Sequence, residues 1–182
     1  MLALFGLVMS ELGDRMRVGA GVTSYDQAHV PATWTFWFVG ATAAFVVVNG
    51  EVSTRLQATE GPVIGRARDA AGALGSCLAV WALSTALPFD RGLTVTVALF
   101  AIAVMGWASF ERTRAGLIMG IGSAMSGTLA EMLFAGQGWF RYTDVLRHMG
   151  NVPAWLPPLY FSAGVAVSQL TRAINGALRA DK

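Results

Sequence analysis

Charged residues are scarce in this chain of 182 residues, in which Asp, Glu, Lys and Arg together make up 13%. Soluble globular proteins carry about 25%. Hydrophobic residues account for 54% of the chain. Because charge covers the surface of a soluble domain, its scarcity here means that much of the surface contacts something other than water. The long apolar runs identify that surrounding as a lipid bilayer.

Other scarce residues exclude classes of function. The single cysteine, Cys77, cannot form an intrachain disulfide and is expected in the core. No His/Glu pair has the spacing of metal ligands, and no Gly-x-Ser-x-Gly motif or Gly-rich phosphate loop is present. The net charge of +2 does not indicate a nucleic-acid partner. We therefore expect no metal, no cofactor apart from a bound lipid, and no enzymatic activity.

Apolar runs separated by polar segments predict an all-α, polytopic membrane protein, a six-helix transmembrane bundle that forms one domain over residues 1–182. Each complete run approaches the ~20 residues that cross a bilayer. The polar, Gly-rich segment from Glu11 to His29 is expected to be an external loop. The expected helices are a partial one at about 1–9 and complete spans at 30–48, 70–87, 93–110, 116–136 and 152–170.

The basic residues predict the orientation, because cytoplasmic loops carry an excess of Lys and Arg. With the N-terminus inside, eight of the 13 basic residues fall in cytoplasmic segments and five in outer ones. Both termini are therefore expected in the cytoplasm. Lysine occurs once, at Lys182, whereas Ala, Gly, Val and Arg abound. GC-rich codons give this bias, so we expect an integral protein of a bacterial cell membrane.

Glu131 lies inside the predicted span 116–136, nearer its outer end. A carboxylate in hydrocarbon is costly and therefore faces the bundle interior, is paired, or is protonated. It would anchor a ligand headgroup in a cavity, or it would bond to a neighbouring helix. If the cavity exists, the second to fifth spans are expected to line it, and its wall is expected to include the apolar residues Phe38, Phe45, Met125, Leu129 and Met132.

Small residues recur four apart in the same span, as in Gly116/Gly120 and Ser123/Gly127. Such spacing lets helix backbones approach closely, here within the bundle. Just before it, Glu111, Arg112 and Arg114 mark a charged turn at the inner surface. The two arginines are expected to anchor that surface or to attract anionic lipid headgroups.

The turn Phe110-Glu111-Arg112-Thr113-Arg114-Ala115-Gly116 resembles a motif of the Insig family, the insulin-induced gene proteins of animal endoplasmic reticulum. That family has Phe-Asp-Arg-Ser-Arg-Ser-Gly, a glycine-rich span, Tyr-x-Tyr-Thr, and Ser-Trp-Leu-Pro before the last helix. Tyr142-Thr143 and Ala154-Trp155-Leu156-Pro157 match the later pieces in order and spacing. The resemblance covers the C-terminal half of the chain.

This resemblance implies a six-helix fold, a membrane-embedded cavity for a sterol, a diacylglycerol-like or another lipid, and regulation by binding. In animals the family's partners are Scap and the sterol-regulated reductase of cholesterol synthesis. The motif aspartate that matters for Scap binding matches Glu111, so Glu111, Arg112 and Arg114 are expected to bind a protein partner whose identity is unknown. Two alternatives stay open: a small lipid-modifying enzyme or transporter that uses Glu131, and a structural bundle that forms homo-oligomers.

Overall fold

The computed structural model describes residues 2–25, 34–60, 65–87 and 92–180, with the side chains of 34–39 and 179–180 left out of the description. Six α-helices follow one another in these residues, so the predicted all-α, six-helix bundle is confirmed. They are α1 (Leu2–Gly19), α2 (Trp34–Ala58), α3 (Ala67–Ala86), α4 (Gly92–Gly106), α5 (Arg114–Gly136) and α6 (Leu156–Ala180). A π-helical turn, η2 (Trp107–Glu111), prolongs α4.

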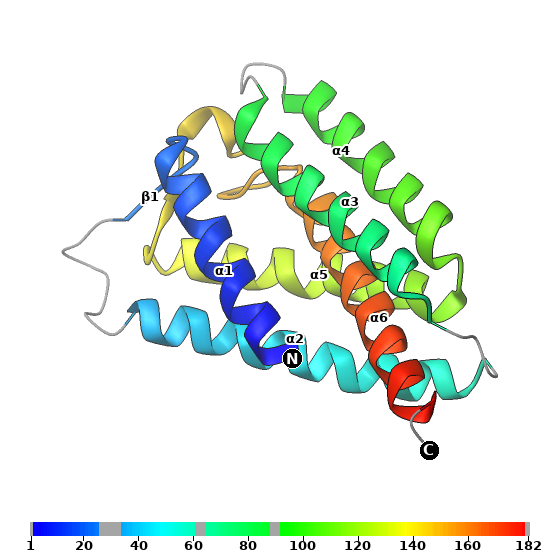
Figure 1. Ribbon diagram of the computed structural model, residues 1–182. Helices are drawn as coiled ribbons and strands as arrows, with labels where there is room; N and C mark the ends of the chain where they lie inside the picture. Colours follow the sequence, from blue (N-terminus) through cyan, green and yellow to red (C-terminus); the bar gives the residue numbers. More distant parts are fainter. Residues whose placement is uncertain (1, 26–33, 61–64, 88–91, 181–182) are drawn as a thin grey trace.

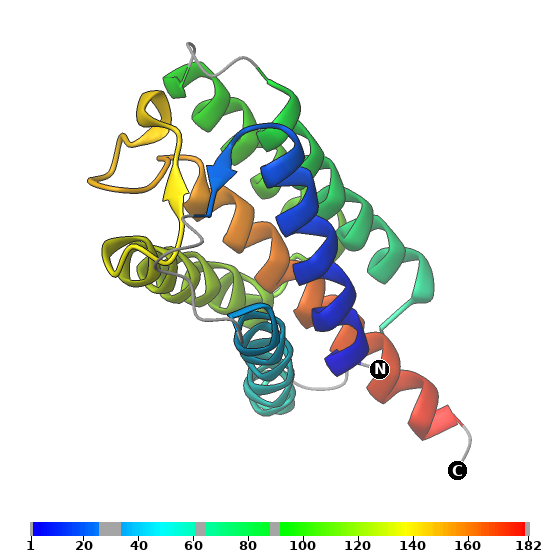
Figure 2. The same ribbon diagram turned by 90° about the vertical axis from the view of Figure 1, so that its left-hand side faces the viewer.

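Helix α6 is the centre of the bundle and packs against α2, α3, α4 and α5. Helices α1, α3, α4 and α6 run side by side in Figure 1, and α2 and α5 cross beneath them. Figure 2 shows α2 and α5 almost end-on as neighbours. The described chain begins and ends toward the lower side in both views, as an even number of passes requires.

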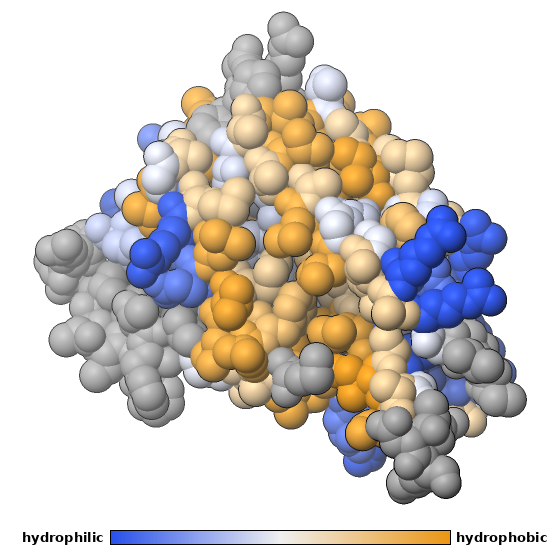
Figure 3. All heavy atoms as spheres, viewed as in Figure 1, coloured by the Kyte–Doolittle hydropathy of each residue, from blue (hydrophilic) through white to orange (hydrophobic). Residues whose placement is uncertain are grey.

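The outer surfaces of α4 and α5 are apolar. Leu93 is 79% exposed on α4 and Met125 is 70% exposed on α5. Among the described helices, α4 with η2 and α5 are long and apolar enough by composition alone to cross a bilayer. Figure 3 shows a further apolar face, over α1, α3 and α4, between groups of hydrophilic side chains at opposite edges of the molecule. This arrangement fits a bundle whose middle faces lipid.

The first helix differs from the sequence prediction. Instead of ending near Met9, α1 continues to Gly19, through the segment expected to be a loop. Its charges are compensated in place, because Arg15 pairs with Glu11 one turn away and Arg17 pairs with a carboxylate from another helix. Arg15 and Arg17 therefore belong to a helix that packs in the bundle, and not to an external loop.

The remaining helix ends also shift from the predicted limits. Helix α2 runs beyond residue 48 to Ala58, with the pair Glu51–Arg55 on its exposed side. Helix α6 begins at Leu156 and not at 152, because Val152 forms a bridge with Met149 and precedes a proline, which disfavours helical backbone. The prolines that follow Leu156 fit the first helical turn, where no N–H is needed.

A small cap closes one end of the bundle. Strand β1 (Thr23–Ser24) pairs antiparallel with β2 (Arg141–Tyr142), and a short 3-10 turn, η3 (Asp144–Leu146), follows. Tyr142 and Leu146 are each 1% exposed, so this segment between two predicted spans packs onto the core. The cap places the Tyr142 side chain above the end of α5.

Candidate functional site

A cavity that is partly open to solvent lies between the helices, and its empty space, counted together with this open part, is about 700 Å³. It is lined by side chains from α1, α2, α3, α5 and α6. The sequence prediction assigned the wall to the second to fifth spans, and this is wrong in three respects. No lining residue comes from α4, α6 contributes four, and α1 contributes five, because Arg17 draws α1 into the bundle.

Glu131 lies at one end of this cavity, 5% exposed. Its Oε1 accepts hydrogen bonds from Nη1 of Arg17 at 2.7 Å and from the Tyr160 hydroxyl at 2.7 Å. Its Oε2 accepts a hydrogen bond from the Tyr142 hydroxyl. Burial raises the pKa of the Tyr142 phenol, so this tyrosine stays protonated and donates. The sequence left two alternatives for Glu131, a headgroup anchor in a cavity or a bond to a neighbouring helix. In the structure Glu131 is bonded to neighbouring segments, and it also borders the cavity.

Arg17 reaches Glu131 because one face of α1 is made of small residues. Gly6, Ser10, Gly13 and Arg17 are its buried positions, spaced three or four apart on one side of the helix. A Cβ at Gly6 would lie 2.9 Å from the Ala43 backbone of α2, so only glycine permits this approach. The Arg17 guanidinium also lies 5.7 Å from the Trp155 ring centroid. The pair with Glu131 is therefore enclosed by aromatic rings and removed from water.

The predicted wall residues separate into three groups. Phe45 lines the cavity. Met125 and Leu129 do not line it, because they lie 70% and 56% exposed on the outer face of α5. Met132 packs against the hydrophobic core and is not among the lining residues, and the side chain of Phe38 lies outside the described residues.

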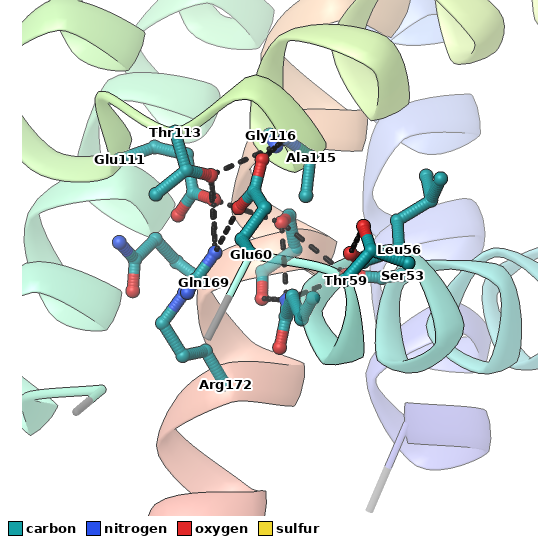
Figure 4. Close-up of polar contacts among 12 residues, drawn as sticks. Ser53, Leu56, Thr59, Glu60, Glu111, Thr113, Ala115, Gly116, Gln169 and Arg172 are labelled. Carbon is teal, nitrogen blue, oxygen red and sulfur yellow. Dashed lines mark hydrogen bonds and ion pairs between the residues drawn. The ribbon is translucent and has the colours of Figure 1, made fainter. Parts of the chain in front are cut away.

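A second buried polar cluster lies at the opposite end of the bundle, where η2 turns into α5 (Figure 4). The Glu111 side chain is fully buried there, and its Oε1 accepts a hydrogen bond from Arg172 of α6 at 3.0 Å. Thr113 and Ser168 donate to the same oxygen at 2.6 and 3.0 Å. Glu60, at the end of α2, accepts from the backbone N–H of Ala115 in the first turn of α5. This cluster joins α2, η2, α5 and α6.

The three residues predicted to bind a partner point in different directions. Glu111 faces the interior, so the structure contradicts a direct contact between this carboxylate and a partner. The arginine that forms an ion pair with Glu111 is Arg172, and not Arg112 or Arg114. Arg112 and Arg114 are exposed. Arg112 has a φ of 55°, which reverses the chain after η2 and turns its side chain outward.

Two of the small residues of α5, Gly120 and Gly127, pack within the bundle as predicted. The ring of Phe161 fills the space beside Gly120, and the ring of Tyr160 fills the space beside Gly127. Both rings belong to α6, so these glycines bring α5 and α6 into contact. Gly122 faces open space instead.

Sequence reasoning missed Arg17 and Tyr160, which bond to Glu131, and Arg172, which pairs with Glu111. Tyr160 and Arg172 lie in or beside a predicted span, and their partners are far away in sequence. A signal for Arg17 was present, because Glu11 and Arg15 are four apart and favour helix in the segment that contains it.

No protein-family model matches the chain. The chain is similar to the insulin-induced gene 1 protein of Danio rerio, with 32% identity over 104 residues that cover 54% of this chain and 40% of that protein. It is also 33% identical over 104 residues to the insulin-induced gene 1 protein of Bos taurus, covering 54% of this chain and 36% of that protein. The chain therefore spans less than half the length of these relatives.

Solved structures resemble the whole chain. The crystal structure of MvINS, a mycobacterial Insig homologue from Mycobacterium vanbaalenii, matches with a TM-score of 0.84 and 25% identity, over 96% of this chain and 92% of that one. A cross-linked trimer of an MvINS cysteine variant matches with a TM-score of 0.84 and 24% identity, over the same shares.

Proposed function

We infer that this chain is an Insig homologue and propose, from that premise, that it holds a membrane lipid in its intramembrane cavity and acts by binding rather than by catalysis. The lipid is a sterol, a diacylglycerol-like molecule or another lipid of similar shape. The protein is proposed to reside in a bacterial cell membrane with both termini in the cytoplasm.

The cavity carries this proposal. Its lining is mostly apolar along its length, with Phe5 and Met9 from α1 and Val46 and Val167 from α2 and α6. The charged pair of Arg17 and Glu131 lies at one end, and the hydrogen-bonded Asn49 and Ser123 line the cavity farther along. Lipid sites have this form, because apolar walls bind hydrocarbon and a few polar groups orient the headgroup.

The geometry of Glu131 argues against the alternative in which this residue handles protons for an enzyme or transporter. Both carboxylate oxygens already accept hydrogen bonds, from one arginine and two tyrosines. A carboxylate has about four acceptor sites, so three of them are occupied here, and a general base needs such a site directed at its substrate. Glu131 instead ties α1, α5, the cap and α6 together at the end of the cavity.

We also propose that the protein forms a homo-oligomer and signals to a protein partner. The cross-linked trimer of the MvINS variant supports the first part. For the second, the exposed side chains of Arg112 and Arg114 lie beside the buried corner at Glu111, which fixes their position. The partner would contact these two arginines, whereas Glu111 would hold them in position from inside the bundle.

Lipid extraction tests the function directly. Purified protein would be washed in mild detergent, extracted, and its lipids measured by mass spectrometry. Ala163→Phe places an aromatic ring in the cavity, whereas Ala177→Phe adds the same ring to an exposed position of α6. The expected result is one enriched lipid class in the wild type and in Ala177→Phe, and its loss from Ala163→Phe. The same bulk lipids in all three samples would contradict the proposal.

A further inference from the structure

Some arginines of this chain pair with a carboxylate, and others do not. The arginines that form ion pairs are Arg15, Arg17, Arg55, Arg147 and Arg172. In contrast, Arg66, Arg68 and Arg112 are exposed and form no ion pair with any described residue. An exposed arginine without a carboxylate keeps its positive charge for a group outside the chain.

The fold brings these three arginines to one edge of the molecule. Gly72 of α3 lies against the ring of Phe110 in η2, since a Cβ there would lie 2.4 Å from a ring carbon. Arg68 is one turn before Gly72 on the same face of α3, and Arg112 follows Phe110 by two residues. Figure 3 shows hydrophilic side chains gathered where α3 begins and η2 ends. We define this basic edge as Arg66, Arg68 and Arg112.

The backbone holds the basic edge in place and adds to its positive potential. Arg112 has a φ of 55°, and its N–H donates to the Trp107 carbonyl at 2.9 Å. Arg66 is the N-cap residue of α3 and makes no side-chain hydrogen bond to the helix. The first N–H groups of a helix carry partial positive charge. Asp69, in the first turn of α3, offsets only one of the three arginine charges.

The apolar surface of the bundle reaches the basic edge directly. Met105 is 58% exposed in the last turn of α4, next to η2, and Leu78 is 39% exposed on α3. Helices α3 and α4 pack against each other. A ligand at this edge therefore meets arginines on one side and an apolar helix surface on the other. An anionic phospholipid matches both, with its headgroup at the arginines and its hydrocarbon on the helices.

We propose that the basic edge binds the phosphate of an anionic phospholipid from the surrounding bilayer, whose acyl chains lie along the outer surface of α3 and α4. Guanidinium groups suit this ligand, because their N–H donors match the oxygens of a phosphate. None of the three arginines lines the cavity, so this site is separate and does not rest on the lipid binding proposed there.

Equilibrium binding of two matched phospholipids to the full-length, delipidated protein in detergent micelles tests this assignment. Radiolabelled dioleoyl phosphatidylglycerol and dioleoyl phosphatidylcholine share their acyl chains and differ in net headgroup charge. The test variant combines Arg66→Gln, Arg68→Gln and Arg112→Gln. The matched control combines Arg15→Gln, Arg55→Gln and Arg147→Gln, which removes the same charge from three arginines that are exposed but paired. Ala163→Phe, with its ring in the cavity, separates this site from the cavity.

The wild type is expected to bind the phosphatidylglycerol at least about tenfold more tightly than the phosphatidylcholine, because each arginine at a membrane surface contributes about fivefold. The test variant is expected to lose this preference, whereas the control variant and Ala163→Phe keep it. Equal affinity of the wild type for the two lipids, or equal losses in the test and control variants, would overturn the assignment. Loss of the preference in Ala163→Phe would overturn it as well, by moving the binding to the cavity.

Discussion

Glu131 and Arg17 contribute opposite charges that neither could carry alone inside the bundle. Their side chains are each 7% exposed and meet at 2.7 Å, and two tyrosines complete the hydrogen bonding of the carboxylate. A buried pair of this kind is weak evidence of net stabilisation, but the removal of one partner leaves a buried charge uncompensated. The main contribution of each residue to stability is therefore to neutralise the buried charge of the other.

Arg17→Met is expected to lower the free energy of unfolding by about 3–5 kcal/mol, because Glu131 loses its cation while the volume of the side chain is nearly kept. Denaturant titration in mild detergent micelles would measure the loss. Arg15→Met is the matched control on the same helix, since Arg15 makes an exposed pair with Glu11. Its expected effect is below about 1 kcal/mol. Equal losses in the two variants would show that the buried pair has no special role.

Residues with distant partners mark the limit of prediction from this sequence. The intramembrane position of Glu131 was sufficient to predict a paired or inward-facing carboxylate. Its cation could not be predicted, because Arg17 lies 114 residues away. The same holds for Glu111, whose nearest arginines in sequence are exposed, while Arg172 from the last helix forms the ion pair.

Among the helices, α5 shows how small residues set the packing. Its first turn begins at Thr113, whose hydroxyl accepts a hydrogen bond from the Gly116 N–H at 3.0 Å, as an N-cap residue does. The Glu111 side chain folds back over Gly116 and occupies the space that a Cβ would need. The corner between η2 and α5 therefore requires glycine at residue 116.

Gly116→Ala is expected to destabilise the protein by about 1–3 kcal/mol, because its Cβ would lie 2.0 Å from Cγ of Glu111 and force that carboxylate away from Arg172. Gly122→Ala provides the control on the same helix, where a Cβ meets nothing within 4 Å. Alanine there should leave stability unchanged or raise it slightly, since alanine favours helix over glycine. Thermal unfolding of the two variants compares them, and an equal shift would contradict the proposed contact.

Helix existence was predictable from the sequence, and helix ends were less so. Apolar runs gave all six helices, the first only in part, because burial in lipid needs no detailed partner. The end of α1 was misplaced, since the charges between Glu11 and Arg17 look like a loop until their partners are known. The start of α6 moved for a local reason, the bridge between Met149 and Val152.

The whole molecule has charged groups at the two ends of an apolar bundle. Five exposed arginines lie at the end that carries Glu60 and η2, namely Arg55, Arg66, Arg68, Arg112 and Arg114. The opposite end carries the β1–β2 cap. We expect the arginine-rich end to face the cytoplasm, because cytoplasmic segments carry an excess of Arg and Lys.

Cysteine labelling tests this orientation in intact cells. In a Cys77→Ala background, Val145→Cys would report on the cap and Ala58→Cys on the arginine-rich end, since both positions are exposed. A membrane-impermeant maleimide should label Val145→Cys on intact cells and Ala58→Cys only after permeabilisation. The reverse pattern would show that the cap faces the cytoplasm.

The central claim is that the cavity beside Glu131 holds a lipid. An experimental structure of the purified protein, solved without added lipid at a resolution that shows ligand density, tests it most directly. The account predicts continuous, elongated density along the cavity from Phe5 to Arg17, with its polar end at the Arg17 guanidinium. A cavity that is closed by repacked side chains, or that contains only isolated water density, would contradict it.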